Sequence, residues 1–137
     1  MEPIEQLAND LAALTRAPAW LAEPPNRAER DEGWRVVVQF IDDFERAGPP
    51  QRQLALAGEP SSTGSACWDA FMAALAEYLS RRFGAEPPSW VFSANRVLEH
   101  WWFPSGYESL YATALIESPA PFAIRGIFLT AGALARL

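Results

Sequence analysis

The apolar positions along the chain follow the spacing of helices. In residues 3–15, four apolar residues recur at every third or fourth position, which predicts a helix with a single apolar stripe. They are Ile4, Leu7, Leu11 and Leu14. Residues 17–26 (APAWLAEPPN) contain three prolines and are therefore predicted to be a connection, which Trp20 and Leu21 anchor on the core.

A second helix is predicted to begin after Asn26, a good N-cap residue with Glu29 three positions later. Its apolar residues share one helical face: Trp34, Val37, Val38, Ile41 and Phe44. The β-branched run WRVVVQFI is also compatible with a strand. The charged tail DDFERAG, with Gly48 at a plausible C′ position, favours a helix. A short helix with the sequence QRQLALA is expected after two prolines.

A broad apolar face marks residues 66–83 as the central helix, for which Ser65 is a suitable cap. Its apolar residues are Trp68, Phe71, Met72, Leu75, Tyr78, Leu79 and Phe83. The preceding segment GEPSSTGS is a loop by composition. It lacks the glycine spacing and the lysine of a phosphate-binding loop, so that function is rejected.

Further elements are predicted in the carboxyl-terminal part, among them a helix with Ser118 as N-cap, Pro119 at N1 and Gly126 at C′. Residues 93–103 are expected to form a helix that Pro104 ends, and residues 107–117 a second one. GIFLT, residues 126–130, is the best strand candidate, and AGALARL should form a last short helix.

These elements predict a mainly α fold: a single-domain bundle of about five to seven helices, with at most a short strand near residues 126–130. At 137 residues one domain is expected. Residues 1–25 would be its amino-terminal helix and proline-rich connection, and residues 26–137 its core.

Composition and charge exclude several classes of protein. The sequence has no run of 18 apolar residues, and its acidic amino terminus lacks the basic region of a secretory signal. A lone cysteine, Cys67, rules out an internal disulfide. We therefore expect a cytoplasmic protein with no membrane association. The net charge of -6 argues against direct nucleic acid binding. Residues 1–50 alone carry ten carboxylates and five arginines, so this acidic half could attract a basic protein.

Candidate chemistry is sparse, and neither an enzyme signature nor a cofactor motif emerges. Glu99 and His100 are adjacent and would point to different helix faces. A Cys67–His100 dyad would require the fold to bring two distant residues together. Asp42, Asp43 and Glu45 could be paired carboxylates, but neighbouring acids on a helix diverge and have no identifiable partner acid. We expect no metal site.

Aromatic residues supply the remaining candidates. One alternative is a small-molecule or enzymatic pocket near Arg96, His100, Tyr107 and Tyr111. The other concerns two consecutive tryptophans. In a helix over 93–103, Trp101 aligns with apolar residues and should be core, whereas Trp102 aligns with a polar edge. Trp102 is then a candidate for a partly exposed contact with a partner, although a core wide enough for both remains the alternative.

Five segments carry a resemblance to a known family. They are FIDDFERAGPPQRQLAL, EPSSTGSACWDAFMAALAEYLSRRFG, PPSW, HWWFP and SPAPFAIRGIFLTAGAL. Together, over roughly residues 34–137, they resemble a group of small proteins from high-GC bacteria, in which a similar segment often follows a helix-turn-helix DNA-binding domain. The group is associated with toxin–antitoxin-like pairs whose partner resembles a nucleotidyltransferase. The first 33 residues of this chain are too short and too proline-rich for a helix-turn-helix unit.

The resemblance implies a non-enzymatic protein-interaction module, an antitoxin-like component that binds and neutralises a nucleotidyltransferase-type toxin. The partner-binding residues expected for it are Asp42, Asp43, Glu45 and Trp102. The pocket described above is the alternative, and a regulator that acts on DNA through a separate subunit is a third hypothesis.

Overall fold

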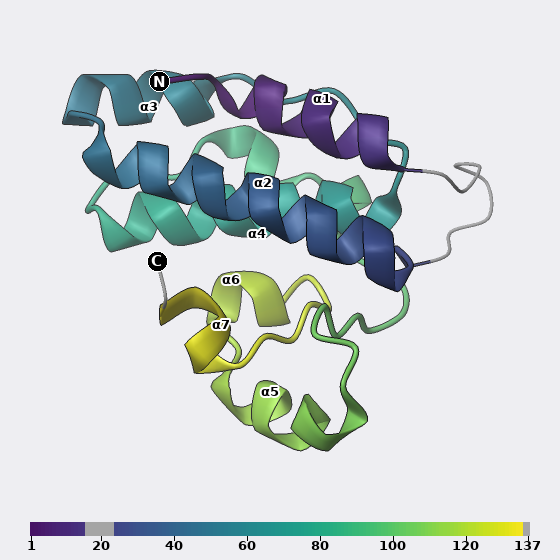
Figure 1. Ribbon diagram of the computed structural model, residues 1–137. Helices are drawn as coiled ribbons and strands as arrows, with labels where there is room; N and C mark the ends of the chain where they lie inside the picture. Colours follow the sequence, from purple (N-terminus) through teal and green to yellow (C-terminus); the bar gives the residue numbers. More distant parts are fainter. Residues whose placement is uncertain (16–23, 136–137) are drawn as a thin grey trace. The chain divides into compact units, whose positions relative to one another are not determined.

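The computed structural model describes residues 1–15 and 24–135 (Figure 1). These residues contain seven α-helices and no β-strand, which confirms the mainly α fold predicted from the sequence. The connection predicted at residues 17–26, with Trp20 and Leu21, lies mostly outside the described residues. By its internal contacts the chain forms two compact units, Met1–Asp69 and Ala70–Leu137, which are described separately. The predicted division at residue 25 stays a prediction.

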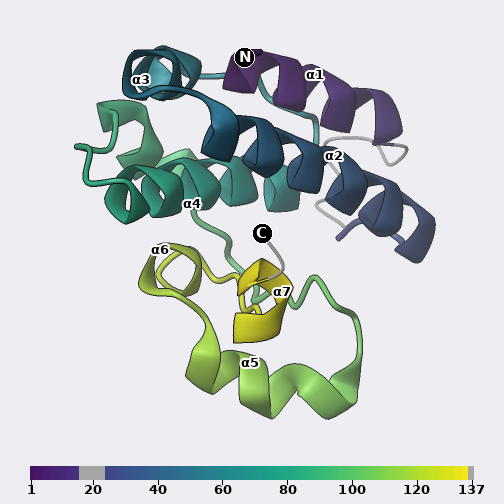
Figure 2. The same cartoon turned by 60° about the vertical axis from the view of Figure 1, so that its left-hand side comes forward.

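The first unit contains helices α1 (Ile4–Leu14), α2 (Arg27–Arg46) and α3 (Pro49–Ala57). Helices α1 and α2 run antiparallel and side by side in both ribbon views (Figures 1 and 2). The apolar stripes predicted for both helices are largely buried. The buried residues are Ile4, Leu7, Ala8 and Leu11 on α1, and Gly33, Val37, Phe40, Ile41 and Phe44 on α2.

Both ends of α2 are capped by side chains. The Oδ1 atom of Asn26 accepts a hydrogen bond from the Glu29 N–H at 2.9 Å, which confirms the predicted N-cap. At the other end, the Arg52 guanidinium donates to the carbonyl oxygens of Phe44 (2.8 Å) and Glu45 (2.7 Å). These carbonyls lie in the last turn, where the helix leaves carbonyl groups short of backbone donors. Arg52 therefore fixes the turn between α2 and α3.

The loop before α4 (Ala66–Arg82) is held by carboxylates. Asp69 accepts hydrogen bonds from the Thr63 N–H (2.7 Å), the Thr63 hydroxyl (2.8 Å) and the Ser62 hydroxyl (2.6 Å). The Ser61 N–H donates to Glu5 on α1 at 2.7 Å. Ser65 accepts from the Trp68 N–H at 3.3 Å, as its predicted role as a cap requires. The composition predicts a loop, and these bonds give it a defined conformation.

In the second unit, the rest of α4 is followed by short elements (Figure 2). Three are 3₁₀ turns, at Ser89–Phe92, Ala94–Arg96 and Glu108–Leu110. The others are α5 (Tyr111–Glu117), α6 (Ala120–Ala123) and α7 (Ala131–Ala135). Gly84 ends α4 with a positive φ of 72°, as expected for its C′ glycine.

The helix predicted over residues 93–103 is wrong. Beyond the turn at Ala94–Arg96 this segment lies beside residues 125–128, as a parallel bridge between Trp102 and Ile127. The Leu98 N–H donates to the Arg125 carbonyl (3.0 Å) and the Trp102 N–H to the Gly126 carbonyl (2.8 Å). Asn, Val, His and aromatic residues are weak helix formers, so these lateral bonds outweigh helix formation. The strand predicted at 126–130 is reduced to this single bridge.

Candidate functional site

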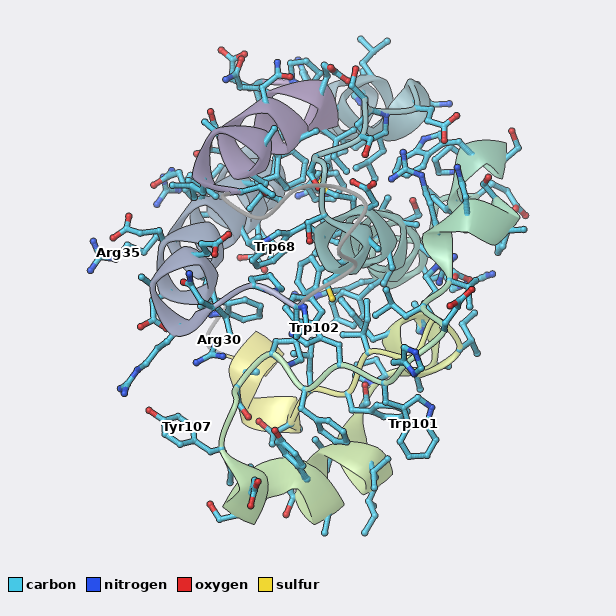
Figure 3. The ribbon with its side chains drawn as sticks, turned by 90° about the vertical axis from the view of Figure 1, so that its right-hand side faces the viewer. Arg30, Arg35, Trp68, Trp101, Trp102 and Tyr107 are labelled. Atoms are coloured by element: carbon cyan, nitrogen blue, oxygen red, sulfur yellow. The ribbon has the colours of Figure 1, made fainter. Side chains whose placement is uncertain are left out.

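The two consecutive tryptophans have the opposite placement from the one predicted. Trp102 is only 5% exposed and Trp101 is 65% exposed. The Trp102 indole meets the Phe71 ring edge-on, with ring centroids 6.3 Å apart, while Trp101 lies at the outside of its unit (Figure 3). The prediction failed because it assumed a helix. Along a non-helical segment that pairs with residues 125–128, Trp102 points inward and Trp101 outward. Trp102 is therefore not an exposed partner contact.

The four residues of the alternative pocket differ in their surroundings. Arg96 is buried, and its guanidinium lies 4.9 Å from the centre of the Trp90 ring. The Tyr111 ring stacks on Phe103 with centroids 3.9 Å apart. His100 is exposed, and so is Tyr107, whose side chain extends away from its unit in Figure 3. Arg96 is thus buried, Tyr111 is half-buried in a ring stack, and His100 and Tyr107 face solvent, which is unlike a site whose polar groups converge.

The acidic residues Asp42, Asp43 and Glu45 occupy the carboxyl-terminal part of α2 and are half-buried. Asp43 accepts a hydrogen bond from the Gln39 amide at 2.9 Å, one turn earlier. Residues 39–45 contain these three carboxylates and no arginine, whereas residues 27–35 contain three of each. The acidic character of α2 is therefore concentrated near one end.

That end is electrostatically unfavourable for carboxylates. The carboxyl terminus of a helix carries partial negative charge, and anions near it destabilise the helix by a few tenths of a kcal/mol each. At the amino-terminal end the charges pair with each other, as in the exposed Arg27–Asp31 (4.0 Å) and Arg35–Glu32 (3.5 Å) ion pairs. Figure 3 shows Arg35 extending outward from this end. Positive charge is also present at the carboxyl end, where Arg46 lies in the last turn and the Arg52 guanidinium donates to the Phe44 and Glu45 carbonyls.

The sequence reasoning missed a buried ion pair in the second unit. The Arg125 guanidinium donates to Glu77 Oε1 (2.8 Å) and to the carbonyls of Val91 (2.7 Å) and Pro121 (2.6 Å). The second Glu77 oxygen accepts from Arg81 at 2.8 Å. The side chains of Glu77 and Arg125 are 5% and 2% exposed. The sequence did contain one signal of this pair, because Glu77 is a carboxylate within the apolar face of the central helix.

This network joins elements of the second unit, and its Glu77–Arg125 pair is buried. Arg125 connects α4 to the segments at Val91 and Pro121, so its role is structural. Burial raises the pKa of Glu77, but the hydrogen bonds and positive charges of Arg125 and Arg81 outweigh burial and lower it overall from its usual 4.5.

The lowered pKa of Glu77 has a consequence for stability. Because the folded state holds the ionised form, the contribution of Glu77 is fully present above pH about 4.5 and is lost as the pH falls through its lowered pKa. We expect the wild-type free energy of unfolding to fall between pH 5 and 3 more steeply than that of Glu77→Gln, measured by urea denaturation. Equal acid slopes for the two proteins would contradict the assignment.

The structure gives no support to Cys67 as a nucleophile or to a metal site among the described residues. Burial raises the pKa of the Cys67 thiol to about 12, so it is protonated at neutral pH and a poor nucleophile. Within residues 1–15 and 24–135, no three His, Cys, Asp or Glu side chains are grouped to hold a metal ion. Over the same ranges, no helix has the length and apolar character needed to cross a membrane.

Comparisons with protein-family models, curated proteins and solved structures found no match to this chain.

Proposed function

We propose that the chain is a non-enzymatic protein-interaction module, an antitoxin-like component that binds and neutralises a nucleotidyltransferase-type toxin. The observation that carries the proposal is the grouping of three carboxylates, Asp42, Asp43 and Glu45, near the carboxyl end of α2 in a chain of net charge -6. The family resemblance of residues 34–137 supplies the class of partner.

The proposed mechanism is electrostatic occupation of the toxin's active face. A nucleotidyltransferase must bind a triphosphate and, in many cases, a nucleic acid, so the face around its active site carries positive charge. An acidic helix end of a protein with net charge -6 is attracted to such a face and prevents the substrate from binding there. Trp102, being buried, has no part in this contact. For this function we expect the chain to act in the cytoplasm together with its partner.

An enzymatic pocket near Arg96, His100, Tyr107 and Tyr111 has less support. Arg96 and Tyr111 are engaged in aromatic packing, so a pocket would have to open before they could meet a substrate.

A pull-down from the native host with the full-length tagged chain tests the proposal. At low salt we expect a nucleotidyltransferase-type protein with a basic face to be captured, and to elute as salt is raised because exposed charges are screened. Purified partner then allows a direct affinity measurement. Capture of no such protein would contradict the proposal.

The acidic cluster is tested by a pair of charge-matched variants. The triple change Asp42→Asn, Asp43→Asn and Glu45→Gln should weaken binding to the captured partner roughly 10- to 100-fold and flatten its salt dependence. The control changes Glu29→Gln, Asp31→Asn and Glu32→Gln remove the same charge from the other end of α2. They should change affinity by no more than about threefold. Equal losses would show that only net charge matters, contrary to the proposed contact.

A further inference from the structure

Four of the large apolar side chains that the second unit exposes come from three neighbouring segments. Phe92 is 57%, Val97 50%, Trp101 65% and Ile124 60% exposed. We call this set the Trp101 face. Single exposed apolar residues are ordinary on protein surfaces, but an apolar patch that several side chains form together often marks a binding surface.

Backbone pairing brings the segment that carries Val97 and Trp101 beside Arg125 and Gly126. The Leu98 N–H, next to Val97, donates to the Arg125 carbonyl at 3.0 Å. The Trp101 ring closely approaches Gly126, where an added Cβ would lie 3.8 Å from Cδ1.

The other two members of the face flank the same segment. Ile124 immediately precedes Arg125 in the chain, and the Arg125 guanidinium lies 5.9 Å from the centre of the Phe92 ring. The face therefore consists of chain segments that are hydrogen-bonded to one another or stacked on the same arginine. It does not depend on a single mobile loop.

The exposed apolar area of the Trp101 face is close to the apolar area that a standard interface buries on each partner. A large side chain offers roughly 200 Å², so the exposed fractions of the four residues amount to roughly 450 Å². A standard interface covers about 800 Å² on each partner, of which about 56–65% is apolar, with homodimers at the upper end. The Trp101 face alone supplies most of that apolar share.

The charge on these segments fits a second copy of this chain. In a twofold symmetric contact the same patch meets itself, so unpaired charges on it repel their symmetry mates. The whole chain has a net charge of -6. Segments 90–101 and 118–130, however, contain only three charged residues, Arg96, Glu99 and Arg125. Both arginines are buried, which leaves Glu99 as the one exposed charge of the two segments.

We propose that the Trp101 face is the interface of a homodimer, formed by two copies of this chain about a twofold axis. The inference is independent of the toxin-binding proposal, because its residues belong to the second unit and the acidic cluster of α2 belongs to the first. Each copy buries the indole of Trp101 against its partner, and the largely uncharged segments allow two acidic chains to associate.

Sedimentation equilibrium of the full chain tests the proposal. We expect the wild-type protein to sediment with the mass of a dimer at tens of micromolar. Ile124→Glu and Trp101→Glu should each raise the dimer dissociation constant by roughly 30-fold or more, the loss typical of central interface residues. The control is Leu54→Glu on α3, where the native side chain is 74% exposed. This variant protein should remain dimeric.

Two readouts keep the result interpretable. Because Trp101 also packs on Phe128, with ring centroids 4.9 Å apart, its variant could lose stability, so Ile124→Glu, at a side chain that is 60% exposed, is the main test. Circular dichroism should show unchanged helicity for Ile124→Glu.

Two results would overturn the proposal. One is a wild-type protein that stays monomeric up to about 1 mM, and the other is an equal dimer dissociation constant for Ile124→Glu and Leu54→Glu. Binding of the captured toxin by Ile124→Glu should be retained, which separates failure of the dimer from failure of the proposed function.

Discussion

Replacing Arg125 with Met is expected to lower the free energy of unfolding by about 3 kcal/mol, near the lower end of the loss seen when one partner of a buried ion pair is removed. The change leaves the carbonyls of Val91 and Pro121 without these donors and removes one of the two arginines that neutralise Glu77. Arg81 still pairs with Glu77 and moderates the loss.

Urea denaturation of matched variants measures this effect. Arg81→Met removes the other arginine, whose side chain is 56% exposed, and should cost no more than about 1 kcal/mol. The double variant Glu77→Leu with Arg125→Met should be more stable than Arg125→Met alone, because no buried charge is left behind. A loss below about 1 kcal/mol for Arg125→Met would show that the ion pair does not hold the second unit together.

Changing Gly33 to Ala is expected to destabilise the protein by about 1–3 kcal/mol, the cost of overpacking a core. In an exposed helix interior the same change stabilises by about 1 kcal/mol. Gly33 lies within α2, however, against the buried Trp68 indole. An added Cβ would overlap Trp68 Cζ2 and lie 3.0 Å from Cη2 and 3.2 Å from Leu11 Cδ2. A rigid buried indole cannot give way as a flexible side chain can.

Gly132→Ala is the matched control. Gly132 also lies in a helix, α7, but an added Cβ there has nothing within 4 Å. We expect this variant to be neutral or slightly more stable in thermal denaturation. If Gly33→Ala and Gly132→Ala unfolded at the same temperature, the close contact between Gly33 and the Trp68 indole would be contradicted.

The elements that sequence reasoning predicted well are those whose signals are local. Caps and periodicity located α1 to α4, because Asn26 and Ser65 bond to N–H groups three residues away and the apolar stripes repeat within each helix. The same reasoning failed over residues 93–103. There the N–H groups of Leu98 and Trp102 bond to carbonyls more than twenty residues away, and no local pattern reveals that competition.

The site residues divide in the same way. The acidic cluster on α2 could be predicted from the sequence, because locating it requires only the predicted helix and the position of its carboxyl end. The placements of Trp101 and Trp102 could not, because they depend on the pairing with Ile127. The Glu77–Arg125 pair joins residues 48 positions apart, and neither is marked by its neighbours. Long-range pairs of this kind require the fold itself.

The most direct test of the proposed function is the nucleotidyltransferase activity of the captured partner, titrated with this chain. We expect activity to fall in proportion to added chain and to vanish near one equivalent, and the Asp42→Asn, Asp43→Asn, Glu45→Gln variant to need roughly 10- to 100-fold more protein. Full transferase activity in the presence of saturating wild-type chain would contradict the account.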